Sequence, residues 1–405
     1  MSSRIVVVGA SLGGLRAAEQ LRAAGYSGQL TVVGEEPYLP YNRPPLSKDV
    51  LADPGDSDAE RLHGKVAFRR RASVSDVNFL LGHRVVCADL AGRRVTLADG
   101  SELVYEGLVV ATGLRPRRLD LPGPTAGRFV LRTLDDVVAL RSRLRPGIRA
   151  VVVGGGFIGS ETACTLTRLG VDVTVVEPFG APMERVLGSD LAVAVQRHLA
   201  DAGVTFVTGV PVVGFAGTDV VTGVALGDGR ELPSDLVVES VGSVCNTEWL
   251  AGNDGLDLSD GVLCHNTLAV AGADRVVAVG DVARFPNPLV DDVPRRVEHW
   301  SIPTDPAKRA AATLVAQIRG ESPDPRPFTP VPSFWSDQLD LRFQSFGSPA
   351  LADRVTLVEG DLDQLAAGVL VTYHRGDTHV GTVAVNPPPA RQRELRAAFD
   401  LVPSA

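Results

Sequence analysis

The feature of this sequence that most constrains its fold is a strand, a glycine-rich turn, a helix and a second strand, which occur twice in the same order. The first copy begins with the β-branched run from Arg4 to Val8 and continues through the turn GASLGG (9–14) to an acid at Glu35. The second copy, AVVVGGGFIGSETACTLTRLGVDVTVVE, covers residues 150–177. One G-x-G-x-x-G match is a weak signal, but two complete units in one chain indicate an α/β fold with two Rossmann-like dinucleotide-binding domains.

The first copy departs from the pattern at its second glycine, where the chain has Ser11. Gly9 makes the tight turn and Gly14 lets the helix and strand pack closely, so the functions of both flanking glycines are kept. At the middle position the backbone approaches a pyrophosphate at the helix N-terminus, and serine adds only one small side chain there. We therefore expect an intact site, in which Glu35 accepts hydrogen bonds from the hydroxyls of the adenosine ribose.

The second copy has all three glycines, Gly154, Gly156 and Gly159, and its second strand ends at Glu177. A carboxylate at that place accepts both ribose hydroxyls but repels a 2′-phosphate, and no arginine directly follows it. The sequence therefore predicts NADH rather than NADPH. Two dinucleotides of one kind would serve no chemical purpose, whereas one FAD and one NADH form a relay for hydride.

Composition excludes several classes of function. The net charge of −8 disfavours nucleic-acid binding, and no apolar run approaches the 18 residues of a membrane span. The opening apolar run is also too short for the core of a signal peptide. The four cysteines form no C-x-x-C pair, and the seven histidines show no metal-ligand spacing. We expect a cytoplasmic protein with four thiols, no metal, no bound nucleic acid and no membrane attachment.

Beyond the two units, the chain resembles the two-dinucleotide flavoproteins that include glutathione reductase. Within them it is most similar to the ferredoxin reductases of bacterial oxygenase systems, of the putidaredoxin reductase type. The resemblance covers essentially the whole chain, and RPPLSK (43–48) and FWSDQ (334–338) are specific to this branch. The other segments that carry it are PYLPYNRPPLSKDVL (37–51), LVVATGLRPRRLDLPG (108–123), GGGFIGSE (154–161), VVGFAG (212–217), VGSVCNTEWL (241–250), RVVAVGDVARF (275–285) and RRVEHW (295–300).

The resemblance assigns cofactor contacts to residues of both units. Those for FAD are Gly9, Ser11, Gly13, Gly14, Glu35, Arg43, Lys48, Val85, Ala111, Thr112, Gly113, Arg132, Gly280, Asp281 and Trp300. Those on the nicotinamide side are Gly154, Gly156, Phe157, Ile158, Gly159, Glu161, Glu177 and Gly242. Phe157 either covers the flavin face until nicotinamide displaces it or is a packing residue.

Lys48 and Glu161 are the pair to which the resemblance gives a catalytic role. Lys48 is expected near flavin N5 and paired with Glu161, where its charge would stabilise the anionic reduced flavin. No general base or nucleophile is needed, because the chemistry belongs to the cofactor.

The resemblance also implies a partner and a domain order. Electrons would pass to a small 2Fe-2S ferredoxin that serves an oxygenase, with a haem-thiolate monooxygenase expected first, and the enzyme would be a monomer. Rubredoxin reductase, NADH oxidase and a non-enzymatic redox-sensing flavoprotein remain as alternatives. A dithiol reductase is excluded because no cysteine lies near Arg43. The expected domains are an FAD domain (1–115 and 243–325), an NAD domain (116–242) and a C-terminal α/β interface domain (326–405).

Two further expectations concern the surface and one helix. An acidic enzyme needs a local basic patch to bind an acidic ferredoxin, and the candidates are 69–71, 295–296 and 308–309, with Arg309 the residue singled out for charge reversal. In SIPTDPAKRAAATL (301–314), the two prolines cannot both lie inside a helix. We expect Asp305 to be the N-cap and Pro306 the first helical residue.

Overall fold

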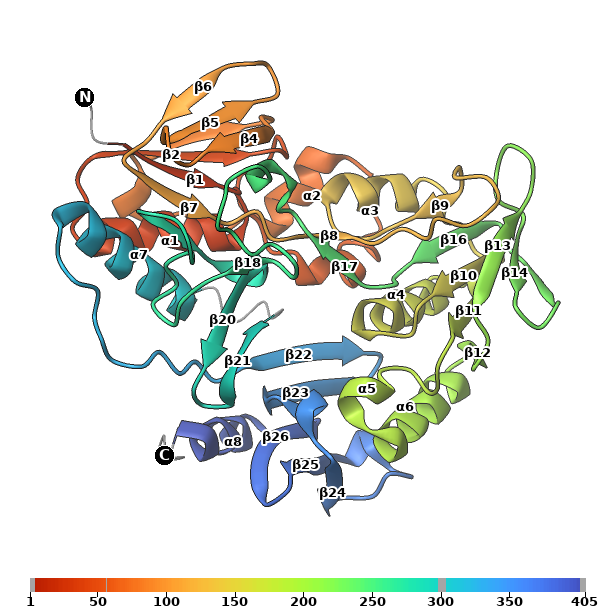
Figure 1. Ribbon diagram of the computed structural model, residues 1–405. Coiled ribbons are helices and arrows are strands. Elements are labelled where there is room, and N and C mark those ends of the chain that lie inside the picture. Colours follow the sequence, from red (N-terminus) through yellow and green to blue (C-terminus); the bar gives the residue numbers. More distant parts are fainter. Residues whose placement is uncertain (1–3, 56, 298–303, 401–405) are drawn as a thin grey trace.

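The computed structural model describes residues 4–55, 57–297 and 304–400, and two parallel β-sheets dominate it (Figure 1). Both sheets contain the strand–helix–strand units that the sequence predicts, with every strand parallel to its neighbours. In the first sheet the order is β19 (Val276–Ala278), β7 (Gly107–Val110), β1 (Arg4–Val8), β2 (Gln29–Gly34) and β3 (Asn78–Leu81). In the second it is β12 (Thr205–Thr208), β11 (Asp172–Glu177), β10 (Arg149–Val153), β16 (Leu236–Glu239) and β9 (Arg128–Phe129).

The two sheets share one topology, because in each the strand before the glycine-rich turn lies at the centre and the strand after the helix lies beside it. Each central strand is apolar after its first residue, and from Ile5 to Val7 and from Val151 to Val152 the side chains are at most 1% exposed. This is the pattern of parallel strands that are buried on both faces. It places both glycine-rich turns at carboxyl ends of strands, where such folds bind their ligands.

Helices cover these sheets. On the first sheet α1 packs against α7, a helix from the far end of the sequence, and α7 also contacts β19. On the second, α4 packs against β10 and β11. The helices are α1 (Leu12–Ala23), α2 (Ala59–Val66), α3 (Leu134–Arg141), α4 (Phe157–Arg168), α5 (Glu184–Leu187), α6 (Ser189–Asp201), α7 (Thr304–Arg319) and α8 (Pro389–Asp400).

Smaller elements, antiparallel except for one parallel strand pair, connect the sheets. A ribbon of β8 and β17 marks the place where the chain passes between the two halves. The strands are β4 (Val85–Asp89), β5 (Arg94–Leu97), β6 (Glu102–Val104), β8 (Leu114–Pro116), β13 (Val212–Ala216), β14 (Gly223–Leu226), β15 (Glu231–Pro233), β17 (Ser243–Cys245), β18 (Val262–Leu263), β20 (Ala283–Asn287) and β21 (Asp291–Arg296).

The C-terminal part is an antiparallel sheet with the helix α8, drawn in blue in Figure 1. Its strand order is β22 (Ser333–Gln338), β23 (Leu341–Gly347), β26 (Thr378–Val385), β25 (Val369–Arg375) and β24 (Arg354–Glu359). The residues Arg375-Gly376-Asp377, between two apolar runs, predict a hairpin turn, and a turn at 376–377 joins β25 to β26. This sheet shares a hydrophobic cluster with the second parallel sheet, in which Phe343 and Tyr373 join Leu191 of α6. Buried packing therefore holds the C-terminal part against the second unit.

One helix boundary differs from the prediction. Helix α7 covers Thr304–Arg319 of the described residues, so Asp305 and Pro306 are helical residues rather than its N-cap and first position. Proline is still tolerated there, because the first-turn N–H groups have no partner inside the helix. Within the described part of the chain, no helix has the length and apolar character needed to cross a membrane.

Candidate active site

The first glycine-rich turn joins β1 to α1 and leaves no room for a side chain at two of its glycines. Gly9 has a φ of +117°, and an added Cβ would lie 2.1 Å from the carbonyl oxygen of Ala111. An added Cβ on Gly14 would lie 1.8 Å from the carbonyl oxygen of Gly9. Both positions therefore require glycine, and the turn they permit brings the N-terminus of α1 to the carboxyl end of β1.

Ser11 occupies a position in this turn that does not need glycine. It is the N-cap of α1, with φ −96° and ψ −164°, a conformation open to any residue. At the equivalent place in the second unit Gly156 has a φ of −70°, and an added Cβ would meet nothing within 4 Å. The second glycine of the motif therefore keeps space for a ligand and is not needed for the turn. The hydroxyl of Ser11 accepts a hydrogen bond from Nε of Arg43 at 3.3 Å.

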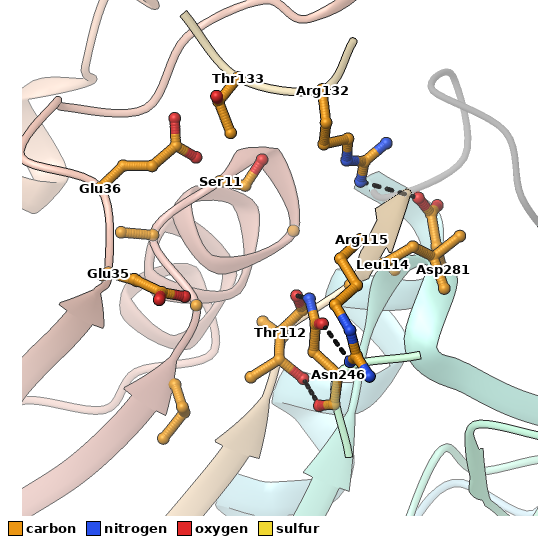
Figure 2. Close-up of a pocket in the computed structure, with 18 of the residues that line it drawn as sticks. Ser11, Glu35, Glu36, Thr112, Leu114, Arg115, Arg132, Thr133, Asn246 and Asp281 are labelled. Carbon is orange, nitrogen blue, oxygen red and sulfur yellow. Dashed lines mark hydrogen bonds and ion pairs between the residues drawn. The ribbon is translucent and has the colours of Figure 1, made fainter. Parts of the chain in front are cut away.

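A cleft of about 1060 Å³ lies beside this turn (Figure 2). Its lining comes from the first sheet, from the loop after β7 and from residues between 244 and 249. The residues assigned to FAD that line it are Gly9, Ser11, Gly13, Glu35, Arg43, Val85, Ala111, Thr112, Gly113, Arg132, Gly280 and Asp281. Gly14 and Lys48 do not line this cleft, and Trp300 lies outside the described residues.

Among the arginines that line the cleft, Arg43 and Arg132 lie next to each other. The guanidinium of Arg43 forms an ion pair with Glu36 and donates to the backbone carbonyl of Arg132 at 2.6 Å. Arg132 in turn lies 3.6 Å from the carboxylate of Asp281. Burial and the neighbouring charge of Arg43 lower the pKa of the Arg132 guanidinium. An anion would relieve the repulsion between these two cations, so the pair fits the pyrophosphate of a dinucleotide.

The adjacent acids Glu35 and Glu36 have different roles. The side chain of Glu35 is 74% exposed and borders the cleft, where its oxygens can accept hydrogen bonds from a ligand. Glu36 binds Arg43 and accepts a hydrogen bond from the hydroxyl of Tyr41. The dinucleotide motif predicts a role for Glu35 but gives no signal for Glu36, which holds Arg43 in place.

Arg115 and Asn246 also line the cleft and were not among the predicted site residues. Thr112 Oγ1 donates to the backbone carbonyl of Asn246 at 2.7 Å, and Asn246 Nδ2 donates to the carbonyl of Thr112 at 3.0 Å. Arg115 donates to Oδ1 of Asn246 at 2.9 Å and forms an ion pair with Glu248 (Figure 2). Both Arg115 and Asn246 lie in motifs that carry the family resemblance, so their positions in those motifs could have identified them.

The second glycine-rich turn repeats the geometry of the first. Gly154 has a φ of +102°, and an added Cβ would lie 2.3 Å from the carbonyl oxygen of Ser240. An added Cβ on Gly159 would lie 2.0 Å from the carbonyl oxygen of Gly154. Gly242, between β16 and β17, has a φ of +93° and open space around it. The turn is therefore shaped for a second dinucleotide. The cleft beside the first turn and a second cavity, between the two units and the C-terminal sheet, are not lined by the residues predicted for this dinucleotide at Gly154, Gly156, Gly159, Glu177 and Gly242.

A second cavity, of about 560 Å³, lies between the first unit, helix α4 of the second unit and the C-terminal sheet. Arg43 and Ser47 line it from the first half, Phe157 and Glu161 from α4, and Trp335 from β22. Ile158, Arg132 and Asp281 line it as well. The ring of Phe157 packs against the ring of Phe334, with centroids 4.7 Å apart. Because Arg43, Arg132 and Asp281 border both cavities, a ligand can extend from the first into the second.

Lys48 and Glu161 form the ion pair that the resemblance predicts. The Nζ of Lys48 lies 2.6 Å from Oε2 of Glu161, and the two side chains are 15% and 7% exposed. Lys48 follows a short 3₁₀ helix, Pro44–Ser47, whose last residue contacts the same carboxylate. The pair therefore joins the first unit to the helix of the second, and Glu161 borders the second cavity while Lys48 lies behind it, outside the lining.

The cysteines show none of the features of a redox dithiol. Within the described residues none of the four forms a disulfide, and Cys164 and Cys264 are buried. Burial raises the pKa of both these thiols to about 12, so they stay protonated at neutral pH. Nor does the described part of the chain contain a group of three or more His, Cys, Asp or Glu side chains placed to hold a metal ion.

The basic patch candidates differ from the expectation at Arg309. Its side chain is 11% exposed and binds Asp324, whereas Lys308 beside it is exposed. Arg295 and Arg296 are paired with Asp291 and Asp260. The choice of Arg309 as a residue of a docking surface was therefore wrong, because its charge is neutralised within the chain.

Comparison with known proteins agrees with this site. The family described as pyridine nucleotide-disulphide oxidoreductase matches residues 3–304, and the reductase C-terminal family matches residues 333–401. The probable ferredoxin reductase CtmF of Castellaniella defragrans is 37% identical, over 94% of this chain and 89% of that protein. Putidaredoxin reductase CamA of Pseudomonas putida is 33% identical, over 99% of this chain and 93% of that protein.

Solved structures agree as well. Putidaredoxin reductase in its covalent complex with putidaredoxin superposes with a TM-score of 0.86, at 31% identity, over 98% of this chain and 93% of that one. The ferredoxin reductase for the CYP199A2 system of Rhodopseudomonas palustris superposes with a TM-score of 0.85, at 32% identity, with the same coverage. The chain is therefore an FAD- and NAD(H)-dependent enzyme that belongs to the pyridine nucleotide-disulphide oxidoreductase family, among the ferredoxin reductases of the putidaredoxin reductase type.

Proposed function

We propose that this enzyme takes electrons from NADH and passes them to a 2Fe-2S ferredoxin that serves an oxygenase, and that it works as a monomer. The observation that carries the proposal is the meeting of two dinucleotide units at one cavity, whose wall includes Glu161 of the second unit, the partner of Lys48 of the first. Bound FAD supplies the chemistry, because a flavin accepts a hydride and releases electrons one at a time. The chain supplies placement and charge.

The first unit would bind FAD by complementing its charges and hydroxyls. The N-terminus of α1 and the guanidiniums of Arg43 and Arg132 face the position of the pyrophosphate. Glu35 is placed to accept hydrogen bonds from the adenosine ribose, and Asp281 from a hydroxyl of the ribityl chain. The open first cavity suits the adenosine half, and the second cavity suits the isoalloxazine ring.

The second unit would bind NADH so that its nicotinamide reaches the same cavity. Glu177 is placed at the carboxyl end of β11, where a carboxylate favours free ribose hydroxyls over a 2′-phosphate. Phe157, at the first position of α4, borders the second cavity and is placed to cover the flavin face until nicotinamide arrives. The side chain of Lys48 would lie near the ring, where its charge would stabilise negative charge that develops on reduction.

The nature of the acceptor is the finer part of the proposal. Support for a 2Fe-2S ferredoxin comes from the likeness to putidaredoxin reductase, whose structure is known in complex with putidaredoxin. Support for a haem-thiolate monooxygenase comes from the likeness to the reductase of a CYP system, although a relative of a biphenyl dioxygenase system is 36% identical. We place the monooxygenase first.

The test is steady-state turnover of the purified flavoprotein with NADH and one acceptor at a time. We expect a kcat/KM for a 2Fe-2S ferredoxin at least tenfold above that for rubredoxin, and little consumption of NADH with oxygen alone. A rubredoxin that is reduced faster, or rapid turnover with oxygen, would replace this function with rubredoxin reduction or NADH oxidation.

A further inference from the structure

Strand β22 of the C-terminal sheet lies against helix α4 of the second unit, and two successive contacts join them. Phe334 packs on Phe157, and Ser336 donates a hydrogen bond to Glu161. Residues two apart share one face of a strand, and residues four apart share one face of a helix. One face of β22 therefore contacts the same face of α4 that borders the second cavity.

The carboxylate of Glu161 is surrounded by donors from three parts of the chain. Its Oε2 accepts a hydrogen bond from Oγ of Ser47 at 2.6 Å and lies 2.6 Å from Nζ of Lys48. Its Oε1 accepts a hydrogen bond from Oγ of Ser336 at 2.6 Å. Glu161 is 6% exposed and Ser336 is fully buried, so water does not compete for these positions.

The direction of the hydrogen bond from Ser336 is fixed by its other neighbour. Nε2 of Gln338 donates to Oγ of Ser336 at 3.2 Å, which leaves the hydroxyl proton free to point at Glu161. A hydrogen bond to an ionised acceptor is roughly twice as strong as one between neutral groups. Ser336 therefore fixes the rotation of the carboxylate from the side opposite Lys48.

We propose that Ser336 is a positioning residue for Lys48, acting from the C-terminal domain through Glu161. The inference rests on the proposed function, in which the flavin lies beside Lys48. Without the hydroxyl, Oε1 of Glu161 loses its donor in a buried setting, and the carboxylate rotates toward its remaining partners. The ammonium of Lys48 moves with it and no longer keeps its place at the ring, so the reduced flavin is less stabilised.

The test compares Ser336→Ala with Ser345→Ala. Ser345 is a matched control, because it lies on the neighbouring strand β23, is fully buried, and has a hydroxyl with no hydrogen-bond partner in the described part of the chain. The measurement is the midpoint potential of the bound flavin, by anaerobic titration at several pH values, together with the FAD content of each variant. No ferredoxin is present.

We expect Ser336→Ala to bind FAD fully but to hold about tenfold less reduced flavin at a given potential, which is a negative shift of about 30 mV for a two-electron couple. Ser345→Ala should keep the wild-type potential. A Ser336→Ala potential equal to that of Ser345→Ala, or a more positive one, overturns the proposal.

A second comparison tests whether the hydroxyl of Ser336 acts through the carboxylate of Glu161. Ser336→Thr keeps a hydroxyl and should keep the wild-type potential. In a Glu161→Gln background, Ser336→Thr and Ser336→Ala should give the same potential, because the hydroxyl acts through the carboxylate. Different potentials in that background contradict the proposal. A wild-type protein that holds no flavin contradicts the proposed function, whereas a flavoprotein whose potential is independent of Ser336 contradicts only this role.

Discussion

The carboxylate of Glu177 accepts a hydrogen bond from the backbone N–H of Gly155, with 2.8 Å between nitrogen and oxygen. The bond connects the acid at the end of β11 to the glycine-rich turn before α4. It fixes negative charge beside the position where the adenosine ribose of a dinucleotide would lie. In the first unit the side chain of Glu35 is 74% exposed and lies 4.0 Å from Arg84, and among the described residues it has no corresponding bond to the glycine-rich turn.

The charge of Glu177 should set the preference for NADH. Glu177→Gln keeps an oxygen for the N–H of Gly155 but removes the repulsion of a 2′-phosphate. We expect the ratio of kcat/KM for NADH over NADPH to fall about tenfold, which is about 1.4 kcal/mol of discrimination. Glu184→Gln, a change of a nearby acid that caps the N–H of Ala181, is the control and should leave the ratio unchanged. An unchanged ratio in Glu177→Gln would place the discrimination elsewhere.

The two glycines of the second turn should respond differently to alanine. Gly154→Ala forces a Cβ to within 2.3 Å of a carbonyl oxygen at a φ of +102°, and a strained backbone of this kind costs about 1–3 kcal/mol before any overlap is counted. Gly156→Ala meets no atom and should leave the unfolding midpoint in urea unchanged, while it weakens NADH binding by entering the ligand space. Equal stability losses would show that both glycines serve the turn.

A buried ion pair should stabilise the second sheet. Arg128 on β9 binds Glu239 on β16 at 2.9 Å, and their side chains are 5% and 0% exposed. Removing one partner leaves the other charge buried, so we expect Glu239→Ala to cost about 3–5 kcal/mol of unfolding free energy. The double variant Arg128→Met with Glu239→Leu should recover much of that loss, as measured by urea denaturation. A small loss in the single variant would mean that Arg128 turns to solvent.

Asp291 should make the contact between the β20–β21 hairpin and the C-terminal sheet dependent on pH. Hydrogen bonds from Arg295, and then from Arg375 of β25, lower the pKa of this carboxyl to about 2 against the effect of burial. Since the folded pKa lies below the unfolded value of about 3.9, the contribution to stability is complete above about pH 4 and is lost as the pH falls toward 2. Asp291→Asn should therefore be less stable than wild type at pH 7, with a difference that shrinks below pH 4.

The exposed neighbour Asp292 gives the control for that measurement. Asp292→Asn should follow the wild-type curve of unfolding free energy against pH. A difference between Asp291→Asn and wild type that stays constant down to pH 2 would show that the ionised carboxylate does not contribute.

Much of the fold could be predicted because it follows from local patterns. The β-branched runs from Arg4 and from Ala150, each followed by a glycine-rich turn, predicted the two central strands and their helices. The turn at 376–377 between two apolar runs predicted the β25–β26 hairpin. These signals are local, since a few adjacent residues determine them.

The parts that could not be predicted depend on contacts between distant segments. Nothing in the sequence near Ser336 shows that its hydroxyl meets Glu161, because the contact forms only when the C-terminal sheet packs on α4. Arg309 looks like a surface cation in sequence, yet the chain at Asp324 folds back and buries it. Helix α7 includes Thr304 and Asp305, and Pro306 is its third described residue. The sequence does not determine this boundary, because proline is tolerated at any position of the first helical turn.

The most direct test of the whole account is one anaerobic rapid-mixing experiment on the purified yellow protein, followed at the flavin absorbance band. We expect NADH to bleach the flavin band fast and NADPH to bleach it slowly at equal concentration. It also predicts recovery of the absorbance when an oxidised 2Fe-2S ferredoxin is added. A protein without flavin, or a flavin that NADH reduces but the ferredoxin does not reoxidise, would contradict it.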